Sequence, residues 1–97
     1  SYKLDVAGTL RAREIIVNTT GADFVFADDY QLRPLSEVET FIKVNKHLPE
    51  IKAAQEMQAN GVSINELQTQ LLQKIEELTL YILQQEKRIR ELEQVYK

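Results

Sequence analysis

The most regular pattern of apolar and polar positions lies in the last third of the chain. Residues 64–97 contain no proline or glycine, and apolar side chains recur there every three or four residues. This pattern predicts one continuous helix, about 50 Å long at 1.5 Å per residue. Ser63 and Glu66 form a capping-box pattern that marks its first turn. Because such a rod is too long to pack only against the preceding residues, we expect most of it to pack against other chains.

The apolar positions of this helix follow the heptad repeat of a coiled coil, in which they occupy positions a and d. Isoleucine takes the a positions at 75, 82 and 89, and leucine takes d at 78 and 92. Upstream, the spacing of four residues between Leu67, Leu71 and Ile75 indicates a stutter, which locally unwinds a supercoil. The seam that this repeat predicts consists of Ile75, Leu78, Ile82, Gln85, Ile89, Leu92 and Tyr96.

Three features bear on the number of helices in the coil. Isoleucine at a with leucine at d favours two parallel strands. Against this, Gln85 occupies a d position, where an unpaired buried amide costs about 1–3 kcal/mol, and a three-fold axis accommodates a ring of such amides. The segment RIRELE, residues 88–93, also resembles the arginine–hydrophobic–x–x–hydrophobic–glutamate signature of parallel trimers. We therefore predict a parallel trimer, with a dimer as the alternative. The predicted trimer interface consists of Ile64, Leu67, Leu71, Ile75, Leu78, Ile82, Gln85, Arg88, Ile89, Leu92, Glu93 and Tyr96.

A second apolar face is predicted on the same helix, because three leucines lie off the seam: Leu72, Leu80 and Leu83. Exposure of one leucine is ordinary, but three indicate a covered face. Ser36 and Glu39 form another capping-box pattern, which predicts a helix that runs to about Lys46. We expect this helix to cover the leucines with its own apolar side chains, Val38, Phe41 and Ile42.

The first thirty residues predict short β-strands. Apolar and polar residues alternate over 2–6, β-branched residues cluster at 14–17, and an apolar run follows at 24–26. Three such strands are not stable alone, so they need other copies of the chain or a covering helix. A short helix is expected near 53–59, before the terminator Asn60-Gly61. The predicted fold class is α+β, with short N-terminal β-strands and short helices followed by a long parallel trimeric coiled-coil helix.

Composition narrows the chemistry that the chain can perform. Twelve basic and fifteen acidic residues give a formal net charge of −3, which argues against a nucleic-acid partner. The absence of cysteine excludes disulfide and thiolate chemistry. No apolar run approaches the roughly 20 residues that cross a bilayer, so we expect no membrane insertion. His47 is the only histidine and Asp28-Asp29 fit a turn, so we expect no enzyme activity, no cofactor and no metal site.

Three stretches of the chain resemble a known type of sequence: YKLDVAGTLRAREI, GADFVFADDYQLRPLSEVETFIKVNKHLPEI and NGVSINELQTQLLQKIEELTLYILQQEKRIRELE. Together they resemble the C-terminal segment of tail-fibre-like proteins of Bacteroidota and their phages. The resemblance implies a homotrimeric fibre end on a virion tail fibre or a cell surface, with attachment to a host-cell glycan or protein receptor as a possible role. We divide the chain into three predicted regions: a β-rich base that continues a fibre shaft (1–30), a helical collar (31–62) and a coiled coil (63–97). The chain starts in strand-like residues without methionine, so we interpret it as part of a longer polypeptide.

Two other functions are open alternatives. The first is a dimeric coiled-coil scaffold or adaptor. The second is an intramolecular chaperone of the phage-fibre type that cuts itself off with a serine and a lysine. The chain offers only Ser1, Ser36 and Ser63, and the two internal serines are explained as helix caps. We therefore expect trimerisation without self-cleavage.

Overall fold

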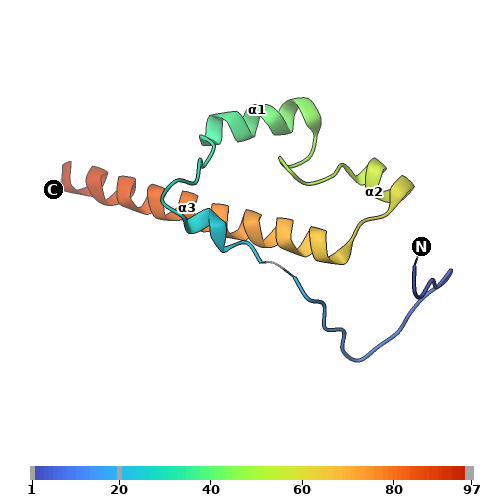
Figure 1. Ribbon diagram of the computed structural model, residues 1–97. Helices are drawn as coiled ribbons and strands as arrows, with labels where there is room; N and C mark the ends of the chain where they lie inside the picture. The colour runs from blue at the N-terminus through green and yellow to red at the C-terminus, as the bar shows by residue number, and fades with distance from the viewer. Residues whose placement is uncertain (1, 20, 96–97) are drawn as a thin grey trace.

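The computed structural model describes residues 2–19 and 21–95. A 3-10 helix, η1 (Asp23–Phe26), precedes three α-helices: α1 (Leu35–Asn45), α2 (Ala54–Asn60) and α3 (Ile64–Val95). Figure 1 shows α3 as the axis of the molecule, with η1 beside its middle, α1 alongside its N-terminal half, α2 near its N-terminal end, and its C-terminal end projecting beyond them. The molecule is elongated, with extents of 63 × 31 × 27 Å. No helix in the described chain is long and apolar enough to cross a membrane.

The predicted α+β fold is wrong, because the described residues contain helices and no strand. Residues 2–19 form an irregular chain that leads away from the helices (Figure 1), and none of them is in a strand or a bridge. Their apolar side chains are largely exposed, including Leu4 at 76% and Ile16 at 83%. The physical reason is that a strand needs a neighbour for its backbone hydrogen bonds, so the period-two pattern alone does not create a sheet.

The apolar run at 24–26, predicted as a strand, forms η1 instead. The Val25 N–H donates to the Ala22 carbonyl at 3.1 Å, and the Ala27 N–H donates to the Phe24 carbonyl at 3.2 Å. Ala22 and Val25 are each only 1% exposed, and η1 lies against α3. Burial of Val25 therefore outweighs the β propensity of a single β-branched residue.

The short helices lie where the sequence predicts them, although one of the predicted caps is wrong. α1 begins at Leu35 after Pro34 and has no side-chain cap, so Ser36 lies inside the first turn and not before it. Lys46 ends α1 in the left-handed conformation, with φ of 63°. Gly61, with φ of 71°, ends α2 as predicted, because glycine adopts this backbone conformation without strain.

The long helix is confirmed over all of its described length. The Ser63 hydroxyl accepts a hydrogen bond from the Glu66 N–H at 3.3 Å, which is the predicted capping interaction. α3 then runs for 32 residues without a break, about 48 Å of helix. Tyr96, the last predicted residue of the seam, lies outside the described residues.

Candidate functional site

α3 has two unlike faces, and the rest of the chain covers the more polar one. The side chains of α3 that are half-buried fall within one arc of the helix, about 40° to 220° on a wheel of 100° per residue. Most of them are polar or charged, which is the reverse of an ordinary amphipathic helix packed on its own domain. They are Leu67, Thr69, Gln70, Gln73, Lys74, Glu76, Glu77, Leu80 and Tyr81.

The opposite face of α3 carries the predicted seam and is open. Its apolar residues are between 46% and 61% exposed: Ile64, Leu71, Ile75, Leu78, Ile82, Ile89 and Leu92. Gln85 is exposed in the same row, and Arg88 and Glu93 are exposed on its two flanks. Leu67 differs, because it is half-buried beside Met57 of α2. We call this row the open seam.

A single copy of the chain buries too little surface to explain its apolar content. Its accessible surface is 8791 Å², whereas a compact monomer of 11.2 kDa has about 5,700 Å². Part of the difference of about 3,000 Å² belongs to the extended residues 2–19, and part to the open seam. A specific interface buries about 800 Å² per partner. The exposed surface is therefore large enough for a stable assembly of several chains.

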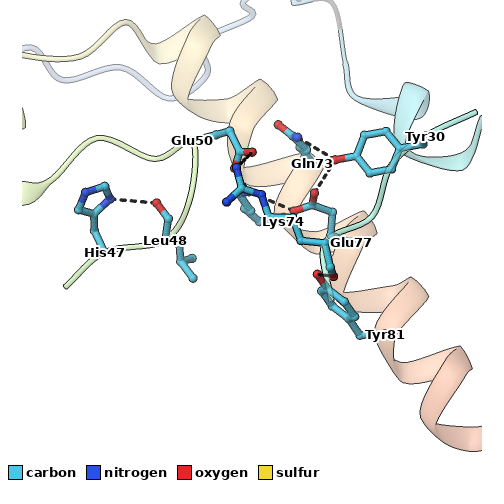
Figure 2. A network of polar contacts seen from close by, with 9 residues as sticks. Tyr30, His47, Leu48, Glu50, Gln73, Lys74, Glu77 and Tyr81 are labelled. Atoms are coloured by element: carbon cyan, nitrogen blue, oxygen red, sulfur yellow. Dashed lines mark hydrogen bonds and ion pairs between the residues drawn. The ribbon is translucent and has the colours of Figure 1, made fainter. Parts of the chain in front are cut away.

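A part-buried group of polar side chains fixes the chain against the covered face of α3 (Figure 2). The Tyr30 hydroxyl donates to the Glu77 carboxylate and accepts from Gln73 Nε2 at 3.0 Å. Lys74 Nζ donates to Glu77 Oε1 at 3.1 Å and to Glu50 Oε2 at 2.6 Å. The side chains of Lys74 and Glu77 are only 12% and 13% exposed. We call Tyr30, Glu50, Gln73, Lys74 and Glu77 the polar latch.

The polar latch has consequences for the titration of its tyrosine. Burial, followed by the hydrogen bond to Glu77, raises the pKa of Tyr30 above its ordinary value. Tyr30 therefore remains a neutral donor, and it shares the Glu77 carboxylate with Lys74. A satisfied network of this kind fixes geometry more than it adds stability. Its role is to position the segment that carries α1.

Two further contacts fix the ends of that segment. The Tyr81 hydroxyl donates to the Arg33 carbonyl at 2.6 Å, just before α1. Arg33 in turn pairs with Glu50 at 3.2 Å, and Glu50 follows α1 and reaches Lys74. The segment from Arg33 to Glu50, which contains α1, is therefore held at Tyr81 of α3 at its first end and at Lys74 at its second end.

The structure corrects the prediction that α1 covers the off-seam leucines. Leu80 and Leu83 border a cleft with the η1 region, lined by Val25, Phe26, Ala27, Tyr30, Leu32, Gln84 and Lys87. α1 lies over a different flank of α3, across an apolar cleft of about 110 Å³ that Leu35, Val38, Leu78 and Tyr81 help to line. Leu72 is 40% exposed and Leu83 is 56% exposed. Heptad spacing cannot indicate which flank of α3 a helix of the same chain will take, so this arrangement has no signal in the sequence.

The other candidate residues have structural partners. His47 packs edge-on against Phe41, with ring centres 5.4 Å apart, and its Nδ1 lies 2.9 Å from the Leu48 carbonyl. Asp28 and Asp29 lie exposed in a turn that the Tyr30 N–H closes by donating to Ala27. Among the described residues, no group of three or more histidine, cysteine or acidic side chains could hold a metal ion.

The polar latch is the feature that sequence reasoning missed. Lys74 and Glu77 are three residues apart on one helix, which is a visible signal for a local ion pair. Nothing in the sequence links this pair to Tyr30 or Glu50, which lie 47 and 24 residues from their partners in α3.

Comparison of the chain with protein-family models, with curated proteins and with solved structures finds no match. The resemblance to the ends of tail-fibre-like proteins is therefore still a prediction, carried by the sequence stretches quoted above.

Proposed function

We propose that the chain is a non-enzymatic trimerisation module, which holds three parallel copies in register at the C-terminal end of a longer tail-fibre-like or surface adhesin protein. One observation carries the proposal: the chain covers the polar face of α3 and leaves the apolar heptad face open. A helix that packs only within its own chain buries its apolar face first. The open seam therefore fits other copies of the same helix.

The composition of the seam favours three copies over two. Gln85 interrupts the apolar row at a d position, and a three-fold axis lets three amides bond to one another or to a central water. Arg88 and Glu93 are exposed on opposite flanks, so in a parallel coil each arginine faces the glutamate of the next copy. The arginine stem then covers apolar surface while its guanidinium group pairs with the carboxylate.

The mechanism of this function is mechanical. Burial of each exposed isoleucine or leucine of the seam stabilises the assembly by roughly 0.8–1.5 kcal/mol, about half of the value for complete burial. The Gln85 layer fixes the register, because a shift of one heptad would place the amide opposite Leu78 or Leu92. Three chains held in this way end in one parallel bundle, which closes the end of a fibre.

The setting on a virion tail fibre or a cell surface is supported by the sequence resemblance alone. In that setting the module holds three chains of the fibre together and contributes to attachment to a surface glycan or protein receptor. The described residues offer no metal-binding cluster for such attachment. The four tyrosines are dispersed along the sequence, at positions 2, 30, 81 and 96.

Sedimentation equilibrium on the purified chain tests the proposal. Three chains of 11.2 kDa give about 34 kDa, which is the expected result for a closed homotrimer. A mass of about 22 kDa would favour the dimeric scaffold, and a single-chain mass at high micromolar concentration would overturn the proposal.

A matched pair of variants separates the seam from the rest of the helix surface. Ile82→Asp places a charge in the open seam and is expected to abolish the assembly, because a buried unpaired carboxylate is strongly unfavourable. Gln94→Asp places the same charge at a position opposite the seam and is expected to leave the mass unchanged. Equal effects of the two variants would contradict the assignment of the seam.

A further inference from the structure

One edge of α1 is apolar and open, although α1 lies beside the long helix. Leu35 and Ile42 lie on one stripe of α1, with Val38 between them, and are 46% and 41% exposed. No Cα atom of α1 lies within 8 Å of a Cα atom of α3. The space between the helices is an apolar cleft of about 110 Å³. At this distance α1 does not pack closely on α3, so Leu35 and Ile42 are only partly covered by their own chain.

The contacts that fix α1 place it on one particular flank of the open seam. Tyr81 binds the Arg33 carbonyl before α1, and Lys74 binds Glu50 after α1. With Ile75 and Ile82 at a, both Lys74 and Tyr81 occupy g positions. α1 therefore lies over the g flank, beside the seam residue Leu78 that borders the cleft.

The other flank of the seam carries an apolar surface of its own. Leu72 and Thr79 occupy e positions, and Leu83 lies at the adjoining b position. Leu72 is 40% exposed and Leu83 is 56% exposed, although η1 begins to cover the helix beside Leu83. This e flank is the only place along α3 where leucines outside the seam are exposed in the described chain.

The geometry of a parallel coiled coil brings these two flanks together. In such a coil, the g flank of one helix faces the e flank of the next helix. We propose that α1 of each copy packs over Leu72 and Leu83 of the next copy and closes the apolar cleft in trans. Each copy then contributes one half of a site that a single chain leaves incomplete. This inference rests on the proposed parallel assembly and adds a specific contact to it.

The positions along the helix axis agree with a second copy as the occupant. α1 spans the turns of α3 between Tyr81, where the segment starts, and Lys74, where it returns. Leu83 and Leu72 of an in-register neighbour are each two residues from these levels, so the proposed packing pairs them with Leu35 and Ile42 respectively. Helices of a coil lie about 8–10 Å apart, so association through the seam brings the e flank of the next helix close to α1. A foreign protein would have to displace that neighbour.

The contact also gives the assembly a direction. Each α1 reaches the same flank of the next copy, so the contact is head-to-tail around the ring and closes after three copies. In an antiparallel pair, g flanks face g flanks, and the α1 helices would meet each other instead. Whether α1 contacts Leu72 of another copy therefore reports the orientation of the chains.

Cysteine cross-linking tests the contact, since the natural chain has no cysteine. The chain with Ile42→Cys and Leu72→Cys is refolded under reducing conditions, its mass is measured, and it is then oxidised. A disulfide requires Cα atoms about 4.4–6.8 Å apart, whereas no Cα pair between α1 and α3 of one chain lies within 8 Å. The expected product is three chains covalently closed into a ring, seen on a non-reducing gel.

A control and a second pair keep the result unambiguous. Val44 is 72% exposed on a different side of α1, so Val44→Cys with Leu72→Cys is expected to cross-link at least about ten-fold more slowly. Leu35→Cys with Leu83→Cys tests the other end of α1, and replaces the first pair if that variant does not assemble.

The outcomes separate this inference from the proposed function. Single chains after oxidation of a protein that sediments as a trimer would overturn the trans packing and leave trimerisation intact. A protein that sediments as a single chain would overturn both. Covalent pairs from a two-chain assembly would support packing in trans and contradict the three-fold ring.

Discussion

Truncation of one seam residue gives a quantitative test of the assembly. Ile82 is 61% exposed in the single chain, so more than half of this residue is left for other copies to bury. Complete burial of an isoleucine stabilises a protein by about 1.5–3 kcal/mol, so burial of the exposed part of Ile82 would add about 1–2 kcal/mol per chain. Ile82→Ala should therefore destabilise a trimer by about 3–6 kcal/mol in total, before any cavity adds to the loss.

The measurement is urea unfolding followed by circular dichroism at several protein concentrations. An assembled protein loses structure at lower urea when it is diluted, because dissociation and unfolding are linked by mass action. We expect Ile82→Ala to lower the unfolding midpoint and to shift dissociation to higher protein concentration. Leu80→Ala is the internal control: Leu80 is already half-buried beside η1, so its loss should destabilise each chain without weakening the association.

The reasoning fails under a specific result. If Ile82→Ala changes the free energy of unfolding by less than about 0.5 kcal/mol per chain, the residue is not buried by other copies. The same conclusion follows if the unfolding midpoint is independent of concentration over a hundredfold range, since a monomer has no such dependence.

Three other variants test separate features of the open seam and of the covered face of α3. Gln85→Leu should raise the thermal midpoint while broadening the distribution of oligomers in sedimentation, because the polar layer sets the register at a cost in stability; a less stable variant that is strictly trimeric would contradict this. Arg88→Ala combined with Glu93→Ala should shift part of the protein toward dimers at low micromolar concentration, and an unchanged mass would argue against the predicted pairing. Burial, followed by the nearby Asp23 carboxylate, raises the pKa of Glu76 above its ordinary value. The native state therefore binds this proton more tightly than the unfolded state, and the resulting stability is full at low pH and lost as the pH rises through the raised pKa. Glu76→Gln should match the natural chain near pH 4 and exceed its stability near neutral pH; a difference that does not vary with pH would refute this assignment.

The sequence predicted well the features that depend on neighbouring residues. The length of α3, the Ser63 cap and the glycine after α2 all follow from local backbone chemistry. The exposed heptad face follows from residue spacing on one helix. Each of these features is set within a few turns of the chain, where sequence distance and spatial distance agree.

The features that the sequence did not predict depend on distant partners. Strands were predicted from alternation and β-branched residues, but the described chain supplies no neighbour for 2–6 or 14–17. The contact from Tyr30 to Glu77 joins positions 47 residues apart, and no local pattern marks it. The flank that α1 takes depends on that latch, which explains why the helix was predicted correctly and its position was not.

The rest of the chain covers the polar face of α3 and leaves its apolar face open, so an unassembled copy has an unusual surface. A lone chain displays a continuous apolar strip, which is the kind of surface that chaperones bind and that leads to aggregation. In the proposed trimer, each copy would hide that strip against the other two. An incomplete assembly would therefore expose the strip, and a complete one would not. Only assemblies with the correct number of chains would then persist.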